Sequence, residues 1–306
     1  MRSSLWRVAQ WGLGLVIVVF VVRYVLANWQ EVQRADLQWR LSPPMLLTGV
    51  ALIWLIFAVL ADAWRRMVAG WGRSLAWMAA ARIWLLSSMA KYVPGKVWAL
   101  AGMAVMSERN GVPAWAATAS AVILQILSLG TGAMVVAVSG LTLLPGRNLP
   151  GTAALALLAA GSLAGTALAL WPPVTRRVVA AIAPSAGLSQ VPGLGPIVFG
   201  TVANLLAWVG YGVAFWLFAR GTLPAAPLTI GVSVGAFTAS YVAGVIAPFA
   251  PGGLGVREGV LVLALRDRTG LATALALAAV ARLGMTVAEV TAAVPFLLRS
   301  RETPRD

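Results

Sequence analysis

The chain has 306 residues, of which 60% are hydrophobic and 10% are charged, and its mean hydropathy of +0.87 excludes an ordinary soluble domain. It contains no Cys and no His, which excludes thiol redox chemistry, Cys/His zinc sites and His-based catalytic triads. The formal net charge of +14 is interpreted mainly as the excess of Lys and Arg that cytoplasmic loops carry, with attraction to anionic lipid headgroups as the second interpretation. No nucleic-acid partner is expected, because no soluble basic domain could present a groove.

Apolar runs of about 20 residues, long enough to cross a bilayer, recur along the chain. The first run, residues 9–27, lacks a small-residue cleavage site, so we expect a retained span and no signal peptide. Two apolar regions, 74–106 and 226–266, are interrupted, and 172–195 is the longest predicted loop. The fold class is therefore an all-α polytopic membrane protein, with about six full transmembrane helices near 9–27, 44–64, 113–141, 151–171, 196–219 and 271–298.

The two interrupted regions follow the same order of features. "AKYVPGKVWALAGMAVMSERNG" and "APFAPGGLGVREGVLVLALRDRTG" each have apolar residues, a Pro-Gly break, a short apolar run, and then charge and Gly. Placing Pro94-Gly95 on Pro251-Gly252 aligns Arg109 with Arg266 without a gap. This predicts one integral membrane domain, 1–306, built from half-repeats at about 44–141 and 196–298 that are joined by the span 151–171.

Each Pro-Gly break must end a helix, because Pro lacks an N–H donor and Gly frees the backbone. In hydrocarbon the freed backbone groups are tolerated only inside protein or beside a wet cavity, so each region is a re-entrant hairpin or an interrupted span. If both regions are hairpins and both termini are cytoplasmic, more Arg residues lie in cytoplasmic loops than if both regions cross the membrane, which is the direction that the positive-inside rule requires. Hairpins also make the two halves inverted repeats. An interfacial aromatic belt is predicted from Trp6, Trp29, Trp39, Trp64, Trp71 and Trp171.

Charged residues stand beside both breaks. The only two lysines, Lys91 and Lys96, flank the first Pro-Gly, and no acidic residue is near them in sequence. Arg257 and Glu258 follow the second break. Ionisable residues inside apolar segments are candidates for a function, although Arg257 and Glu258 could instead pair with each other or cap the short helix that follows.

Other polar residues within apolar sequence have structural and functional interpretations that stay open. Arg282 and Glu289 are seven residues apart on one helix face and could form interhelical pairs or line a cavity. Asp62 and Arg82 fit an interfacial role, in which long side chains extend to the headgroups. Gln125 is a mid-span amide of the kind that joins helices.

The sequence does not favour an enzyme. "GGLGVREG" lacks the GxGxxG spacing and the βαβ surroundings of a dinucleotide loop. Glu258 and Glu289 have no accompanying nucleophile–base arrangement and no carboxylate metal cluster. We therefore expect no catalytic residues, no metal and no cofactor.

The pair "KYVPGK" and "APGGLGVREG" resembles the transmembrane region of the lysylphosphatidylglycerol synthase/flippase family, over about residues 44–298. The resemblance implies translocation of a lipid with a charged or glycosylated headgroup between leaflets. Bifunctional members of that family carry a separate soluble synthase domain, for which this chain has no room. The family often has a Glu-Arg pair in the span after the first motif, where this chain reads "LQIL" and Gln125 replaces the acid.

The leading hypothesis is a lipid flippase-like transporter that moves a phospholipid or lipid-linked headgroup through a basic central cavity of a bacterial inner membrane protein. The alternatives are a secondary transporter of a soluble anion, a non-transporting partner of a lipid-modifying enzyme, and an intramembrane transferase. Expected partners are membrane lipids, with a homo-oligomer and a lipid-modifying enzyme as further candidates. Predicted substrate-binding residues are Lys91, Tyr92, Pro94, Gly95, Lys96, Pro251, Gly252, Gly253, Gly255, Arg257 and Glu258. Cavity or coupling candidates are Arg82, Gln125, Arg282 and Glu289.

Overall fold

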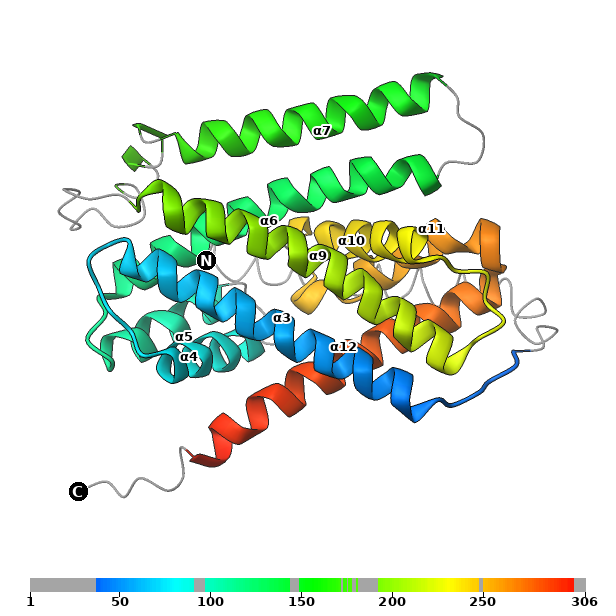
Figure 1. Cartoon of the computed structure of the whole chain (residues 1–306), viewed down its shortest axis with the longest axis horizontal. Helices are drawn as coiled ribbons and strands as arrows, with labels where there is room; N and C mark the ends of the chain where they lie inside the picture. The colour runs from blue at the N-terminus through cyan, green and yellow to red at the C-terminus, as the bar shows by residue number, and fades with distance from the viewer. Residues whose placement is uncertain are drawn as a thin grey trace, which may run out of the picture.

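The computed structural model describes residues 37–90, 97–143, 149–171, 173, 174, 176, 177, 180, 192–247 and 250–299. Within these ranges the regular secondary structure is helical, which confirms the all-α fold class (Figure 1). The α-helices are α3 (Pro43–Ala69), α4 (Trp77–Met89), α5 (Val97–Glu108), α6 (Ala114–Leu143), α7 (Leu149–Leu170), α9 (Leu194–Thr222), α10 (Ile230–Ile246), α11 (Val256–Thr269) and α12 (Leu271–Arg299).

Within the described ranges, four helices are long and apolar enough to cross a bilayer, which makes this an integral membrane protein with several spans. They match the predicted spans 44–64, 113–141, 196–219 and 271–298. The predicted span 151–171 corresponds to α7, which packs against α6 at the edge of the molecule (Figure 1). The predicted span 9–27 lies outside the described residues. The four candidate spans are Pro43–Ala69, Ala114–Gly140, Leu194–Thr222 and Leu271–Leu298.

Each interrupted region forms two short helices that pack against each other. In the first region these are α4 and α5, and in the second they are α10 and α11, with the short 3-10 turn η2 (Pro251–Gly253) between them. The side chain of Thr229 caps the start of α10 by accepting a hydrogen bond from the Val232 N–H at 3.3 Å. In Figure 1, α4 and α5 lie toward the left end of the molecule, whereas α11 lies toward the right end.

The centre of the molecule is built on α3 and α9, which pack along each other and run in opposite directions (Figure 1). One buried apolar cluster joins α9, α10, α11 and α12 to α3, and a second joins α3 to α4, α5 and α6. The Trp54 indole N–H donates to the Ala288 carbonyl at 3.1 Å, which links α3 to α12 directly. The first interrupted region is thus attached to the core through α3 and α6, and the second through α9, α6 and α12.

The predicted aromatic belt is wrong at two positions. Trp64 is fully buried and donates its indole N–H to the Ala117 carbonyl at 3.1 Å, while Trp71 is 5% exposed and donates to the Ser120 hydroxyl at 3.1 Å. Both rings fill the second apolar cluster, and α6 supplies the partner that a buried indole N–H needs. Trp39 and Trp171 are exposed, in agreement with an interfacial position, and Trp6 and Trp29 lie outside the described residues.

Candidate functional site

The turn between α10 and α11 has the break that the sequence predicts. Helix α10 ends at Ile246, and the backbone then passes through Gly252, Gly253 and Gly255 with φ values of 58°, 71° and 79°. These positive φ values are unfavourable for residues with a side chain, so the glycines allow the chain to reverse in a short distance. The Gly253 N–H donates to the Ala250 carbonyl at 2.9 Å and closes the turn.

The first turn of α11 holds both charges of the motif. Glu258 is the third residue of the helix, and its Oε2 accepts the Gly255 N–H at 2.7 Å, which confirms the capping role considered from the sequence. Arg257 is the second residue of the helix, where the positive end of the helix dipole opposes a cation. The helix start therefore stabilises Glu258 and leaves Arg257 at an electrostatically unfavourable position.

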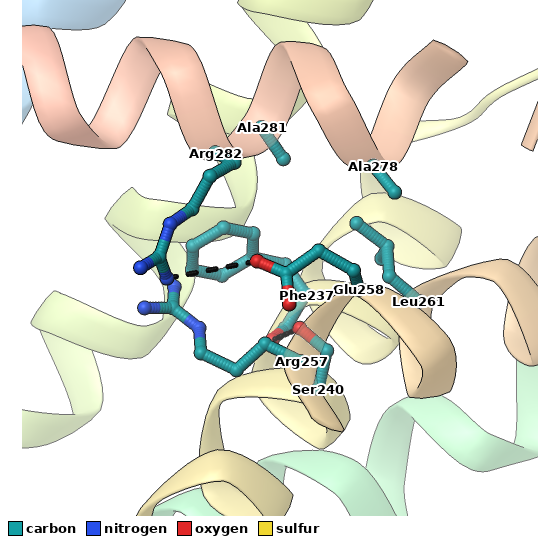
Figure 2. Close-up of a pocket in the computed structure, with 8 residues that line it drawn as sticks. All are labelled: Phe237, Ser240, Arg257, Glu258, Leu261, Ala278, Ala281 and Arg282. Atoms are coloured by element: carbon teal, nitrogen blue, oxygen red, sulfur yellow. Dashed lines mark hydrogen bonds and ion pairs between the residues drawn. The ribbon is translucent and has the colours of Figure 1, made fainter. Parts of the chain in front are cut away.

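Arg282, on α12, reaches the same turn. Its Nη1 lies 3.6 Å from Glu258 Oε1 (Figure 2). The same Nη1 donates to the Gly252 carbonyl at 3.1 Å. The side chains of Arg282 and Glu258 are 19% and 25% exposed, so the pair is shielded from solvent but not sealed. The interhelical role considered for Arg282 is confirmed, with α11 as the partner helix.

The position of Gly270 explains why Glu258 and Arg282 meet. Gly270, with φ 78°, is the single residue between α11 and α12, and the two helices pack against each other beyond it. Glu258 precedes Gly270 by twelve residues and Arg282 follows it by twelve, so the two side chains stand at the same level of the helix pair. At about 1.5 Å per residue, that level is about 18 Å along each helix from Gly270.

Arg257 packs on α10. Its guanidinium carbon lies 3.9 Å from the centre of the Tyr241 ring and 5.9 Å from that of Phe237, which is a cation–π arrangement. The alkyl part of Arg257 crosses Gly244 and Gly253, where a Cβ atom on either glycine would overlap it. Among the described residues, no carboxylate forms an ion pair with Arg257, so the Arg257–Glu258 pair considered from the sequence is not found.

These side chains line a small pocket between α10, α11 and α12 (Figure 2). Arg257 and Arg282 extend toward the same side of it, with Glu258 between the helices. Two guanidinium groups and one carboxylate give these three residues a net positive charge, and the pocket between them has room for about one water molecule. The lining residues are Phe237, Ser240, Arg257, Glu258, Leu261, Ala278, Ala281 and Arg282.

The other candidate residues are placed elsewhere. Arg82 on α4 and Gln125 on α6 have exposed side chains, and neither lines this pocket. Glu289 on α12 does not line the pocket either; it is 2% exposed, and both it and Arg257 lie within electrostatic range of Tyr211. The predicted residues of the first motif lie outside the described residues, namely Lys91, Tyr92, Pro94, Gly95 and Lys96.

Sequence reasoning missed the contribution of α10. Tyr241 and Gly244, three residues apart on one face of that helix, hold the guanidinium and the alkyl part of Arg257. The sequence carries a signal for them, since Tyr241 is a polar aromatic residue in the apolar run before the break. The equal spacing of Glu258 and Arg282 about Gly270 is a second signal, and it needs the helix boundaries to be known.

A family model described as the lysylphosphatidylglycerol synthase TM region matches residues 11–292 of the chain. No protein of curated function matches the chain in sequence. The match covers most of the chain and includes α3 to α11 and most of α12. The chain therefore belongs to the transmembrane-region family of lysylphosphatidylglycerol synthase, a family of lipid-related membrane proteins.

Proposed function

We propose that the protein is a lipid flippase-like transporter, which moves a phospholipid or a lipid-linked headgroup between leaflets through a basic central cavity. The observation that carries the proposal is the arrangement of Arg257, Arg282 and Glu258 at the turn between α10 and α11. Membership of a lipid-related membrane family supports a lipid as the cargo. In this proposal the headgroup phosphate contacts the arginines while the tails stay in the bilayer.

Electrostatics supports an anionic ligand at this turn. A charged side chain within a membrane-embedded segment costs several kcal/mol, about 2.5–3.5 by insertion scales, so two arginines at one turn need a compensating role. Glu258 forms its ion pair with Arg282, and Arg257 stands at the positive end of α11. A phosphate group would satisfy both cations together, because arginine binds phosphate well.

We further propose that the two helix pairs are re-entrant hairpins of two inverted half-repeats, 44–141 and 196–298. The packing of α4 on α5 and of α10 on α11 supports hairpins, as does the position of α4 and α5 toward one end of the molecule and of α11 toward the other (Figure 1). Full spans at 9–27 and 151–171 would complete six spans, with both termini in the cytoplasm of a bacterium. In this arrangement Lys91 and Lys96 approach the headgroup from one side and Arg257 from the other.

The proposal assigns transport and no catalysis to the domain. A transporter of a soluble anion would use the same cluster but would not require lipid tails. A non-transporting partner of a lipid-modifying enzyme would tolerate loss of Arg257 and Arg282. An intramembrane transferase would form product from lipid when purified. These alternatives differ in outcomes that one reconstituted system can measure.

The test is transbilayer movement of fluorescent lipids in proteoliposomes, measured by quenching of the outer leaflet. We expect the wild type to accelerate movement of an anionic phospholipid, and Arg257→Gln and Arg282→Gln each to abolish most of that acceleration. Arg73→Gln is the matched control, because Arg73 is exposed and outside the pocket. Unchanged movement in folded Arg257→Gln and Arg282→Gln proteins would overturn the proposal, as would transport of soluble phosphate without lipid movement.

A further inference from the structure

The two oxygens of Glu258 make contacts of unequal strength. Oε2 accepts the Gly255 N–H at 2.7 Å, which is a short charge-assisted hydrogen bond. Oε1 lies 3.6 Å from Arg282 Nη1, which is longer than a hydrogen bond and leaves an ion pair held by charge alone. The carboxylate is therefore fixed by α11, and its hold on Arg282 is loose.

Arg282 is held in place by a second, stronger contact. The same Nη1 donates to the Gly252 carbonyl at 3.1 Å, which fixes the guanidinium against the turn even if Glu258 is displaced. The side chain is 19% exposed at the pocket, where Arg257 extends to the same side (Figure 2). An anion that arrived between the two arginines would compete with Glu258 for Arg282.

We infer that Glu258 is a built-in competitor for the anion site, which occupies Arg282 until a phosphate group displaces it. This inference rests on the proposed function and deepens it. Displacement would cost the loose Arg282–Glu258 contact and would leave the Gly255 cap and the Gly252 contact intact. By competing for Arg282, Glu258 lowers the affinity of the site for phosphate. A lower affinity suits a transport site, which must release its ligand after each transfer across the bilayer.

The inference is tested by measuring how tightly the purified full chain binds anions in detergent. The measurement is a calorimetric titration with each of three probes. Inorganic phosphate and a short-chain phosphatidylglycerol both carry the phosphate charge, and a short-chain diacylglycerol is the uncharged control. Glu258→Gln is the key variant, because its amide oxygen still accepts the Gly255 N–H. We expect Glu258→Gln to bind the phosphate probes about fivefold more tightly, since a partly exposed ion pair is worth up to about 1 kcal/mol.

Two controls separate local competition from a general effect of charge. Asp267→Asn removes one negative charge from α11 at a position whose side chain is 80% exposed, and it should leave affinity unchanged. In an Arg282→Gln background, Glu258→Gln should lose its effect, because the competition acts through Arg282. If Glu258→Gln binds inorganic phosphate more tightly than the wild type does, the site recognises the phosphate group alone. If only the binding of phosphatidylglycerol becomes tighter, the ligand is the lipid.

Each contrary outcome has a distinct meaning. If the wild type binds phosphate probes but Glu258→Gln binds them equally or more weakly, the competitor role is overturned and the proposed function stands. If the effect persists in the Arg282→Gln background, or if Asp267→Asn reproduces it, local competition is likewise overturned. If neither the wild type nor Glu258→Gln binds any phosphate probe, the anion site and the proposed function fail together.

Discussion

The guanidinium carbon of Arg257 lies 3.9 Å from the centre of the Tyr241 ring. The ring belongs to an aromatic group in which Tyr241 stacks on Tyr211, with centres 6.1 Å apart, and meets Trp208 edge to face at 5.5 Å. The aromatic face that orients Arg257 is therefore itself fixed by packing. The side chain of Arg257 belongs to α11, but it is oriented by a ring on α10 that in turn packs against α9.

The Tyr241 ring should matter more than its hydroxyl. We expect Tyr241→Phe to keep lipid transport near the wild-type rate, because the aromatic face remains. Tyr241→Leu should slow transport several-fold, since a cation–π contact contributes about 0.5–2 kcal/mol. The lipid transport rate of both variants is measured in the proteoliposome assay, with equal amounts of folded protein. Equal rates for Tyr241→Leu and the wild type would show that the ring does not orient Arg257 for function.

Gly244 should not tolerate a side chain. In Gly244→Ala, the new Cβ would lie 2.9 Å from Arg257 Cδ and 3.3 Å from Gly253 Cα, so α10 and the turn must separate. We expect a lower Tm, from overpacking that costs about 1–3 kcal/mol, together with a loss of transport. Gly259→Ala on α11 is the matched control, because no atom lies within 4 Å of its Cβ position. A Gly244→Ala protein as stable and active as Gly259→Ala would contradict the close packing of Arg257.

The hydrogen bond between Trp54 and Ala288 should contribute to stability. Trp54→Phe keeps an aromatic ring but loses the 3.1 Å contact between α3 and α12. We expect the free energy of unfolding to fall by about 1 kcal/mol, the usual contribution of one such bond. Trp39→Phe is the control, because Trp39 and Trp54 are similarly exposed, at 54% and 44%, and the Trp39 indole makes no hydrogen bond within the described residues. The Tm values of the two variants are compared by thermal unfolding in the same detergent. Equal values would show that the contact contributes nothing to stability.

Labelling can test the inverted hairpins directly, because the chain contains no Cys and single cysteines can be introduced one at a time. We expect Ser74→Cys and Asn110→Cys to react with an impermeant maleimide from the same side of the membrane. Asp267→Cys should react from the opposite side. All three positions are exposed. Labelling of Ser74→Cys and Asn110→Cys from opposite sides would refute the first hairpin, and labelling of Asn110→Cys and Asp267→Cys from one side would refute the inversion.

Hydropathy and the Pro-Gly breaks predict most of the helical layout. The ends of the predicted spans 196–219 and 271–298 lie within three residues of the ends of α9 and α12, because an apolar run of bilayer length has little freedom to be anything except a helix. The break at Pro251-Gly252 is predicted equally well, since Pro and Gly act on the local backbone alone.

Side-chain contacts are predicted less well than helix positions. Trp64 and Trp71 have the position in sequence of interfacial residues, and only the packing of α6 against α3 turns them into core residues. Glu258 was considered as a partner of Arg257, its neighbour in sequence, yet it pairs with Arg282 across the helix pair. Adjacent residues on a helix point about 100° apart, so nearness in sequence is a poor guide to contact.

The joint at Gly270 makes the lengths of α11 and the first part of α12 depend on each other. One inserted residue on either side would rotate one partner by about 100° and move it about 1.5 Å along the axis, which would separate Glu258 from Arg282. A matched insertion of one residue on both sides would keep the two residues at one level, but it would rotate both side chains away from the face on which the helices meet. The lengths of both segments are therefore fixed by this one contact.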